Sequence, residues 1–237
     1  MAEKRTPMHR AVMSSTAFEA QAAVARAMLY EGYSAFAGRR LKLNFDERCS
    51  PFSDRQELAR RMSREDLRVV DEEIMAVYSF KSISTMGTNE DLLYFLPRIF
   101  DLVVESVINP EAEWNSHETL WLKKLSMLVE AKSFSVDELA FVGRYLDALW
   151  VLITLDHEQY WHLAMDFLEH AIEIQPIDYF FTLWLDSATV EVLHVLGDEA
   201  TQPCGILHYG PVQKKIAADI EAWLQTERVA EKISQIL

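Results

Sequence analysis

The sequence predicts an all-α protein of about nine helices, and three observations lead to this fold class. Gly and Pro number only 7 each in 237 residues, which is few for a protein of strands and tight turns. Half of the residues are hydrophobic, among them 12 Phe, 8 Tyr and 6 Trp, so the chain can bury a sizeable core. These residues recur at helical spacing along most of the chain. Helical hairpins stacked around one proline-kinked central helix would satisfy the pattern.

The chain is expected to hold one domain. Residues 1–13 are predicted to be a mobile arm and residues 14–237 a single helical domain, with a subdivision near residues 110–116 as the alternative. The basic start lacks the apolar region of a secretory signal, and no apolar run reaches the roughly 18 residues that span a bilayer. Cys49 and Cys204 form no metal-ligand spacing and predict no disulfide framework. We therefore expect a cytoplasmic protein.

Serine caps mark the first helices. Residues 14–37 carry apolar side chains at helical spacing, and Gly38 is placed to end this helix. The irregular stretch GRRLKLNFDERCSPFS alternates briefly, which fits either a short edge strand or a loop, and we favour the loop. Ser53 begins a second helix with a capping sequence, and Ser63 opens a third that is expected to continue to about Phe80.

The central helix is the longest clean helical pattern, Thr88–Asn109. Thr88 is a good N-cap, and Asp91 three residues later completes an approximate capping box. A continuous apolar stripe follows. Pro97 lies well inside the pattern and should kink the helix, because it removes a backbone donor. A helix that is apolar along this length needs other helices around it.

The second half of the chain supplies those helices. The capping sequence Ser135-Val136-Asp137-Glu138 precedes a helix whose end, ALWVLITL, is apolar nearly all round and should lie deep in the core. Helices are predicted over residues 117–131, 135–153, 157–174 and 177–196, with a single final helix from Pro211 onward.

The formal net charge of -14 is unevenly distributed. Residues 1–144 contain 19 Lys and Arg against 22 Asp and Glu, and residues 214–237 contain 4 of each. Between Arg144 and Lys214 there is no Lys or Arg, but there are 11 acids. This acidic stretch argues against nucleic acid or an anionic membrane as partner, because both require the opposite sign of charge.

A metal site is one interpretation of the acidic stretch. His162, Asp166 and His170 are spaced i, i+4, i+8, so one helix face could present all three. Glu191 and His194 form a Glu-x-x-His pair, but di-iron bundles need two such pairs and further glutamates. The zinc-protease motif is absent. Histidines that bind no metal are the alternative, and we favour it.

Nucleophilic catalysis is weakly indicated. Cys204 lies four residues before His208, but an acidic neighbourhood raises the pKa of a thiol and opposes its reactivity. The sequence contains no G-x-S-x-G, P-loop or G-x-G-x-x-G motif. For Arg98 we predict a structural pairing with a core acid in preference to catalysis.

The segment from about Glu65 to Glu105 resembles a group of uncharacterised bacterial helical proteins. The resemblance lies in Gly87, Asp91 and the run Phe95-Leu96-Pro97-Arg98. Members of that group pair a tryptophan-glycine turn with this helix and often carry a cysteine cluster upstream, where this chain has Met86-Gly87 and the single Cys49. The resemblance implies a bacterial all-α domain, and no activity comes with it.

A binding function is therefore the leading hypothesis. Aromatic residues interleave with the acids between residues 150 and 184, which suits a basic protein partner, although a plain solvated acidic face is the open alternative. The concrete version is an immunity protein that neutralises a bacterial toxin, without a cofactor. A metal-dependent enzyme and a self-associating scaffold are the alternatives. The predicted partner-binding residues are Asp156, Glu158, Trp161, Asp166, Glu169, Glu173, Asp178 and Glu191.

Overall fold

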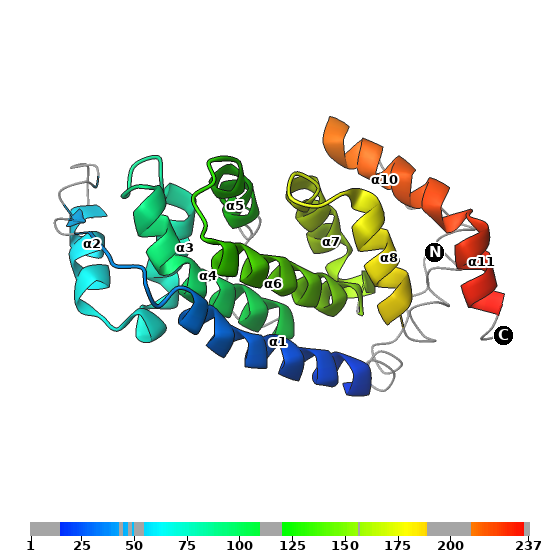
Figure 1. Cartoon of the computed structure of the whole chain (residues 1–237), viewed down its shortest axis with the longest axis horizontal. Coiled ribbons are helices and arrows are strands. Elements are labelled where there is room, and N and C mark those ends of the chain that lie inside the picture. The colour runs from blue at the N-terminus through cyan, green and yellow to red at the C-terminus, as the bar shows by residue number, and fades with distance from the viewer. Residues whose placement is uncertain are drawn as a thin grey trace, which may run out of the picture. The chain divides into compact units, whose positions relative to one another are not determined.

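The computed structural model describes residues 15–42, 45–46, 49, 55–109, 120–155, 157–188 and 210–234. These residues form ten α-helices and one 3-10 turn, with no strand among them (Figure 1), so the predicted all-α class is confirmed. None of the helices in these ranges is both long and apolar enough to cross a membrane. The elements are α1 (Ser15–Ala35), α2 (Arg55–Arg64), η3 (Leu67–Val69), α3 (Glu72–Lys81), α4 (Asn89–Ile108), α5 (Leu120–Glu130), α6 (Val136–Thr154), α7 (His157–Ala171), α8 (Ile177–Ser187), α10 (Pro211–Leu224) and α11 (Glu227–Ser234).

The chain divides into two compact units. Unit 1 comprises Met1–Val24 with Asp147–Leu237, and unit 2 comprises Ala25–Leu146. The boundaries fall inside α1 and α6. The predicted mobile arm and the alternative subdivision near residues 110–116 lie outside the described residues. The expectation of one domain over residues 14–237 stays a prediction.

Helix α4 forms the core of unit 2, as its sequence pattern predicts. The capping box is present: the Thr88 backbone N–H donates to Asp91 Oδ2 at 2.9 Å, and the Asp91 N–H donates to the Thr88 hydroxyl at 3.5 Å. Phe100 of α4 packs against Tyr145 with ring centroids 4.2 Å apart and against Trp121 at 5.7 Å. The kink at Pro97 stays a prediction.

The helix predicted to open at Ser63 and run to about Phe80 is wrong at its start. Helix α2 continues through Arg64, and a break follows before α3 begins at Glu72. The physical reason is a competing local cap, because Asp71 Oδ1 accepts a hydrogen bond from the Ile74 N–H at 3.2 Å. Helix α4 also stabilises the break, because Arg98 Nε donates to the carbonyl of Val70 at 3.1 Å.

Two predicted helices near the C-terminus are too long. The helix expected over residues 177–196 ends at Ser187, and Ala188 is extended. The Ser187 hydroxyl donates to the carbonyl of Leu183 at 2.7 Å, a local bond that weakens the helical ladder. The single final helix is two, α10 and α11, because the Thr226 N–H turns back to the Trp223 carbonyl at 3.0 Å.

Gly87 should tolerate no side chain. Its φ is +80°, and an added Cβ would lie 2.7 Å from Phe45 Cε2 and 3.1 Å from Asp91 Cβ. Phe45 is buried, so the contact cannot be relieved at the surface. We expect Gly87→Ala to lower the free energy of unfolding by about 1–3 kcal/mol in urea denaturation. Gly38→Ala is the control, because an added Cβ there has nothing within 4 Å. Equal effects of the two substitutions would contradict this account.

Candidate functional site

The turn between α7 and α8 in unit 1 is a well-defined part of the acidic stretch. The turn is closed by backbone bonds from Ile174 and Gln175 to the Ala171 carbonyl, each 2.9 Å long. Pro176 then precedes α8, with φ −58° and no side-chain cap. Beneath the turn three buried rings pack together: Trp150 lies 5.4 Å from Phe167 and 5.7 Å from Phe180 between ring centroids. The corner is thus fixed to a rigid aromatic core.

Three carboxylates at this corner have no ion-pair partner among the described residues. Glu173 and Asp178 are exposed, and Glu169 is half-buried. Within the described part of the chain none of the three makes an ion pair. By contrast, Asp186 at the end of α8 is neutralised by Arg228 at 3.2 Å. Among the described acids of this stretch, the charge is therefore most available at the α7–α8 turn.

A tyrosine completes the corner. Tyr179 is 40% exposed, and its hydroxyl donates to Asp147 Oδ2 at 2.8 Å. Burial, together with this hydrogen bond, raises the pKa of Tyr179 to about 12. Burial also raises the pKa of Asp147 above its usual value, while the bond from Tyr179 acts in the opposite direction. We call Asp147, Glu169, Glu173, Asp178 and Tyr179 the acidic corner.

The other residues predicted to bind a partner are less informative. Asp166 is half-buried, and its Oδ1 accepts a hydrogen bond from Gln213 Nε2 at 2.7 Å. Asp156 and Glu191 lie outside the described residues, as do the side chains of Glu158 and Trp161. Most of the described aromatic residues of this stretch are buried in the core, as the plainer interpretation holds: Trp150, Phe167, Phe180, Phe181 and Trp184.

The predicted metal ligands are only partly described. Asp166 and His170 lie four residues apart on α7, whereas the side chain of His162 and all of Glu191 and His194 lie outside the described residues. No group of three or more potential ligands occurs among the side chains that the structure describes. Cys49 is buried, and its thiol donates to the Phe45 carbonyl at 3.3 Å.

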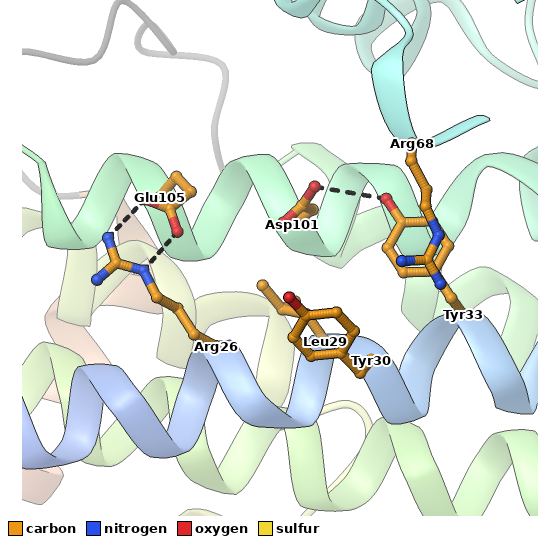
Figure 2. A pocket seen from close by; sticks show the side chains of 7 residues that line it. All are labelled: Arg26, Leu29, Tyr30, Tyr33, Arg68, Asp101 and Glu105. Carbon is orange, nitrogen blue, oxygen red and sulfur yellow. Dashed lines mark hydrogen bonds and ion pairs between the residues drawn. The ribbon is translucent and has the colours of Figure 1, made fainter. Parts of the chain in front are cut away.

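The structure also contains a pocket in unit 2 that the sequence does not predict. Its volume is about 210 Å³, and it opens between α1, α4 and η3 (Figure 2). The Arg26–Glu105 ion pair bounds one end and the stacked side chains of Arg68 and Tyr33 bound the other. The lining residues are Arg26, Leu29, Tyr30, Tyr33, Arg68, Asp101 and Glu105. They come from three separate segments, and their spacing along the chain resembles no known motif.

Arg98 and Asp101 support this pocket. Arg98 Nη1 lies 2.7 Å from Asp101 Oδ2, so Arg98 does pair with an acid, but this acid is half-buried and does not belong to the core. The Tyr33 hydroxyl donates to the same oxygen at 3.4 Å. Burial and the negative charge of Asp101 raise the pKa of Tyr33 far above its ordinary value. Tyr33 therefore stays a protonated hydrogen-bond donor.

Lys124 of α5 is a half-buried cation with a structural explanation. Its ammonium donates to the carbonyl oxygens of Ser79 and Phe80, at the end of α3, and to the Ser82 hydroxyl at 2.8 Å. Lysines commonly satisfy the last carbonyls of a helix in this way. Burial, with the nearby charge of Lys81, lowers the pKa of Lys124 to about 8. All three donors have acceptors, so we assign Lys124 to stability.

Comparisons of the chain with protein-family models, curated proteins and solved structures found no significant match. The resemblance of residues 65–105 to uncharacterised bacterial helical proteins therefore stays a prediction.

Removal of the Tyr179 hydroxyl should change the titration of Asp147. Because the bond from Tyr179 lowers the pKa of Asp147, we expect Tyr179→Phe to raise that pKa further. The folded state then binds more protons than the unfolded state above pH 3.8, so the contribution of Asp147 to stability falls as the pH rises through its folded pKa. A carbon-13 NMR titration of the carboxyl group measures the shift, with Tyr30→Phe as control. An unchanged or lower pKa in Tyr179→Phe would contradict the assignment.

Lys124→Met should destabilise the protein at neutral pH by about 1–3 kcal/mol, because it leaves buried acceptors without donors. Lys124 has a folded pKa near 8 against an ordinary 10.5, so between these values the unfolded state binds more protons. The stability advantage of the wild type over Lys124→Met should therefore grow as the pH rises from 8. Urea denaturation at several pH values measures this trend. The neighbouring, exposed Lys123 gives the control Lys123→Met, and a matching trend there would refute the prediction.

Proposed function

We propose that this protein binds and masks a basic protein through the acidic corner, most concretely as an immunity protein that neutralises a toxin. The supporting observation is a set of three carboxylates, Glu169, Glu173 and Asp178, which make no ion pair with any described residue and which precede or adjoin the exposed Tyr179 in the chain. They lie in a stretch that contains no Lys or Arg between residues 145 and 213. Unit 1 as a whole contains 7 Lys and Arg against 17 Asp and Glu.

The two kinds of side chain in the corner would serve different steps of binding. Exposed carboxylates attract a basic surface over long range and accelerate encounter. A tyrosine supplies contact area at low conformational cost, and such residues often dominate binding energy once water is excluded. Because the Tyr179 hydroxyl is already held by Asp147, its ring is positioned before a partner arrives, which reduces the entropy lost on binding.

The proposed target is an enzyme that acts on an anionic substrate. The binding cleft of such an enzyme is lined by Lys and Arg, because it must attract negative charge. A rigid surface of carboxylates offers the same charge without a reactive group, so it can occupy the cleft as an inhibitor. Like charge also disfavours nucleic acid as a direct partner of the corner.

The metal-dependent alternative rests on His162, Asp166, His170, Glu191 and His194. Three of these five side chains lie outside the described residues, and the two that are described come with no third ligand among the described side chains. No specific observation favours this alternative over masking of a basic partner, and it stays a prediction.

Co-purification with the product of the adjacent gene, at low and at high salt, tests the proposal. We expect a complex that weakens as salt rises, because exposed charges are screened. The triple variant Glu169→Lys, Glu173→Lys, Asp178→Lys should bind at least tenfold more weakly in a titration of the purified pair.

The matched control reverses three exposed acids of unit 2, Glu73→Lys, Glu130→Lys and Asp137→Lys, which changes the net charge equally. Asp137 and Asp178 each occupy the second position of a helix, so these two substitutions disturb a helix dipole alike. Lysozyme serves as an unrelated basic protein. Absence of a complex at both salt concentrations, equal losses in the two variants, or equally tight binding of lysozyme would each overturn the proposal.

A further inference from the structure

Among the described residues, the pocket of unit 2 contains one cation without an ion pair. Arg26 is paired with Glu105 through two short bonds of 2.7 and 2.8 Å. Asp101 accepts from Arg98 at 2.7 Å and from the Tyr33 hydroxyl at 3.4 Å. Arg68 is left, and within the described ranges its guanidinium has no hydrogen bond or ion pair to another side chain. The pocket and its supporting arginine therefore carry one net positive charge.

The position of Arg68 leaves its donors available. The guanidinium carbon lies 4.3 Å from the centroid of the Tyr33 ring and 6.0 Å from that of Tyr30. A guanidinium that stacks on a ring uses its face, whereas its N–H donors point outward in its plane. Two parallel N–H groups at the edge of this plane match the two oxygens of a carboxylate or phosphate. Stacking thus orients Arg68 before an anion binds.

The rest of the lining suits an apolar or planar group. Leu29 is buried at the base, and Tyr30 offers a ring that is 69% exposed. In Figure 2 both lie between the Arg26–Glu105 ion pair at one end of the pocket and the stacked Arg68 and Tyr33 at the other. A cavity of about 150 Å³ accommodates benzene, so the volume of about 210 Å³ here admits a single ring with one small substituent.

We propose that this pocket binds a small carboxylate or phosphate ester that carries one ring or a short apolar chain. Arg68 ligates the anion, and Leu29, Tyr30 and Tyr33 contact the remainder. Two ion pairs fix the walls: Arg26–Glu105 joins α1 to α4, and Asp101, which is paired with Arg98, accepts a hydrogen bond from the Tyr33 hydroxyl. This site is separate from the acidic corner in residues and in the sign of its ligand.

A purely structural role for Arg68 is the competing explanation. By stacking on Tyr33, the arginine also attaches η3 to α1, a contact worth about 0.5–2 kcal/mol. A structural role predicts lost stability without any ligand. A binding role predicts saturable affinity for small anions that depends on the N–H fork of Arg68.

The test is calorimetric titration of the intact protein with benzoate, phenyl phosphate and inorganic phosphate as separate probes. We expect saturable binding of at least one aromatic anion, weakened at least tenfold in Arg68→Met. Arg68→Lys keeps the charge but lacks the fork, and it should bind with intermediate affinity. Tyr30→Ala should weaken the two aromatic probes much more than inorganic phosphate. The tighter of benzoate and phenyl phosphate identifies the preferred anion.

Arg144→Met is the matched control, because Arg144 is an exposed arginine of unit 2 that lies outside the pocket and pairs with Glu31 at 3.1 Å. Absence of saturable binding for all three probes would overturn the proposal, as would an equal loss of affinity in Arg68→Met and Arg144→Met. Circular dichroism would reveal whether Arg68→Met folds. If it does not, Tyr30→Ala provides the test, and an unchanged affinity of Tyr30→Ala for the aromatic probes would refute the site.

Discussion

The burial of α4 is the constraint on which unit 2 depends. Its apolar side chains are enclosed almost completely, with Phe95, Ile99 and Phe100 each 0% exposed. A helix enclosed in this way must gather its polar residues on the little surface that remains. Arg98, Asp101 and Glu105 occupy this surface at a spacing of i, i+3, i+7, which places them on one side of the helix. The core packing of α4 therefore also creates the polar wall of the pocket.

Helix α1 forms the opposite wall of the pocket, and helical spacing again places the lining residues together. Arg26, Leu29, Tyr30 and Tyr33 recur at intervals of three, one and three residues along this helix, so they share one face. Two of them meet acids of α4 with the correct partner for each: Arg26 with Glu105, and Tyr33 with Asp101. These contacts desolvate charged groups only partly, since Arg26 and Glu105 remain 49% and 41% exposed. These contacts therefore add little to the free energy of unfolding, and their main effect is to fix the register of α1 against α4.

Local signals account for what the sequence could predict. Thr88 with Asp91 and Ser135 with Glu138 are reciprocal capping pairs three residues apart, and both are present in the structure. The helix breaks at Asp71 and Thr226 were missed, because apolar periodicity continues through them and a single competing hydrogen bond decides the outcome. The pocket could not be predicted for a different reason. Arg26 and Glu105 are 79 residues apart, and the sequence around neither residue indicates that the two form an ion pair. Charge segregation did indicate the acidic stretch, but only the fold distinguishes Glu169, Glu173 and Asp178 from Asp166 and Asp186 among the described acids.

The two proposed sites differ in the range over which each should attract its ligand. At physiological ionic strength the screening length is roughly 8 Å, and it limits attraction between exposed charges much more than between sheltered ones. Glu173 and Asp178 are exposed, so their attraction for a basic partner weakens steeply with salt. Arg68 is also exposed, but the ring of Tyr33 lies 4.3 Å from its guanidinium carbon and orients its N–H donors for direct contact with an anion. Because the whole chain has a net charge of -14, an anion gains little from long-range attraction and depends on the short-range fork of Arg68. The ligand of the pocket must therefore fit closely, whereas the partner of the acidic corner needs first of all the right sign of charge.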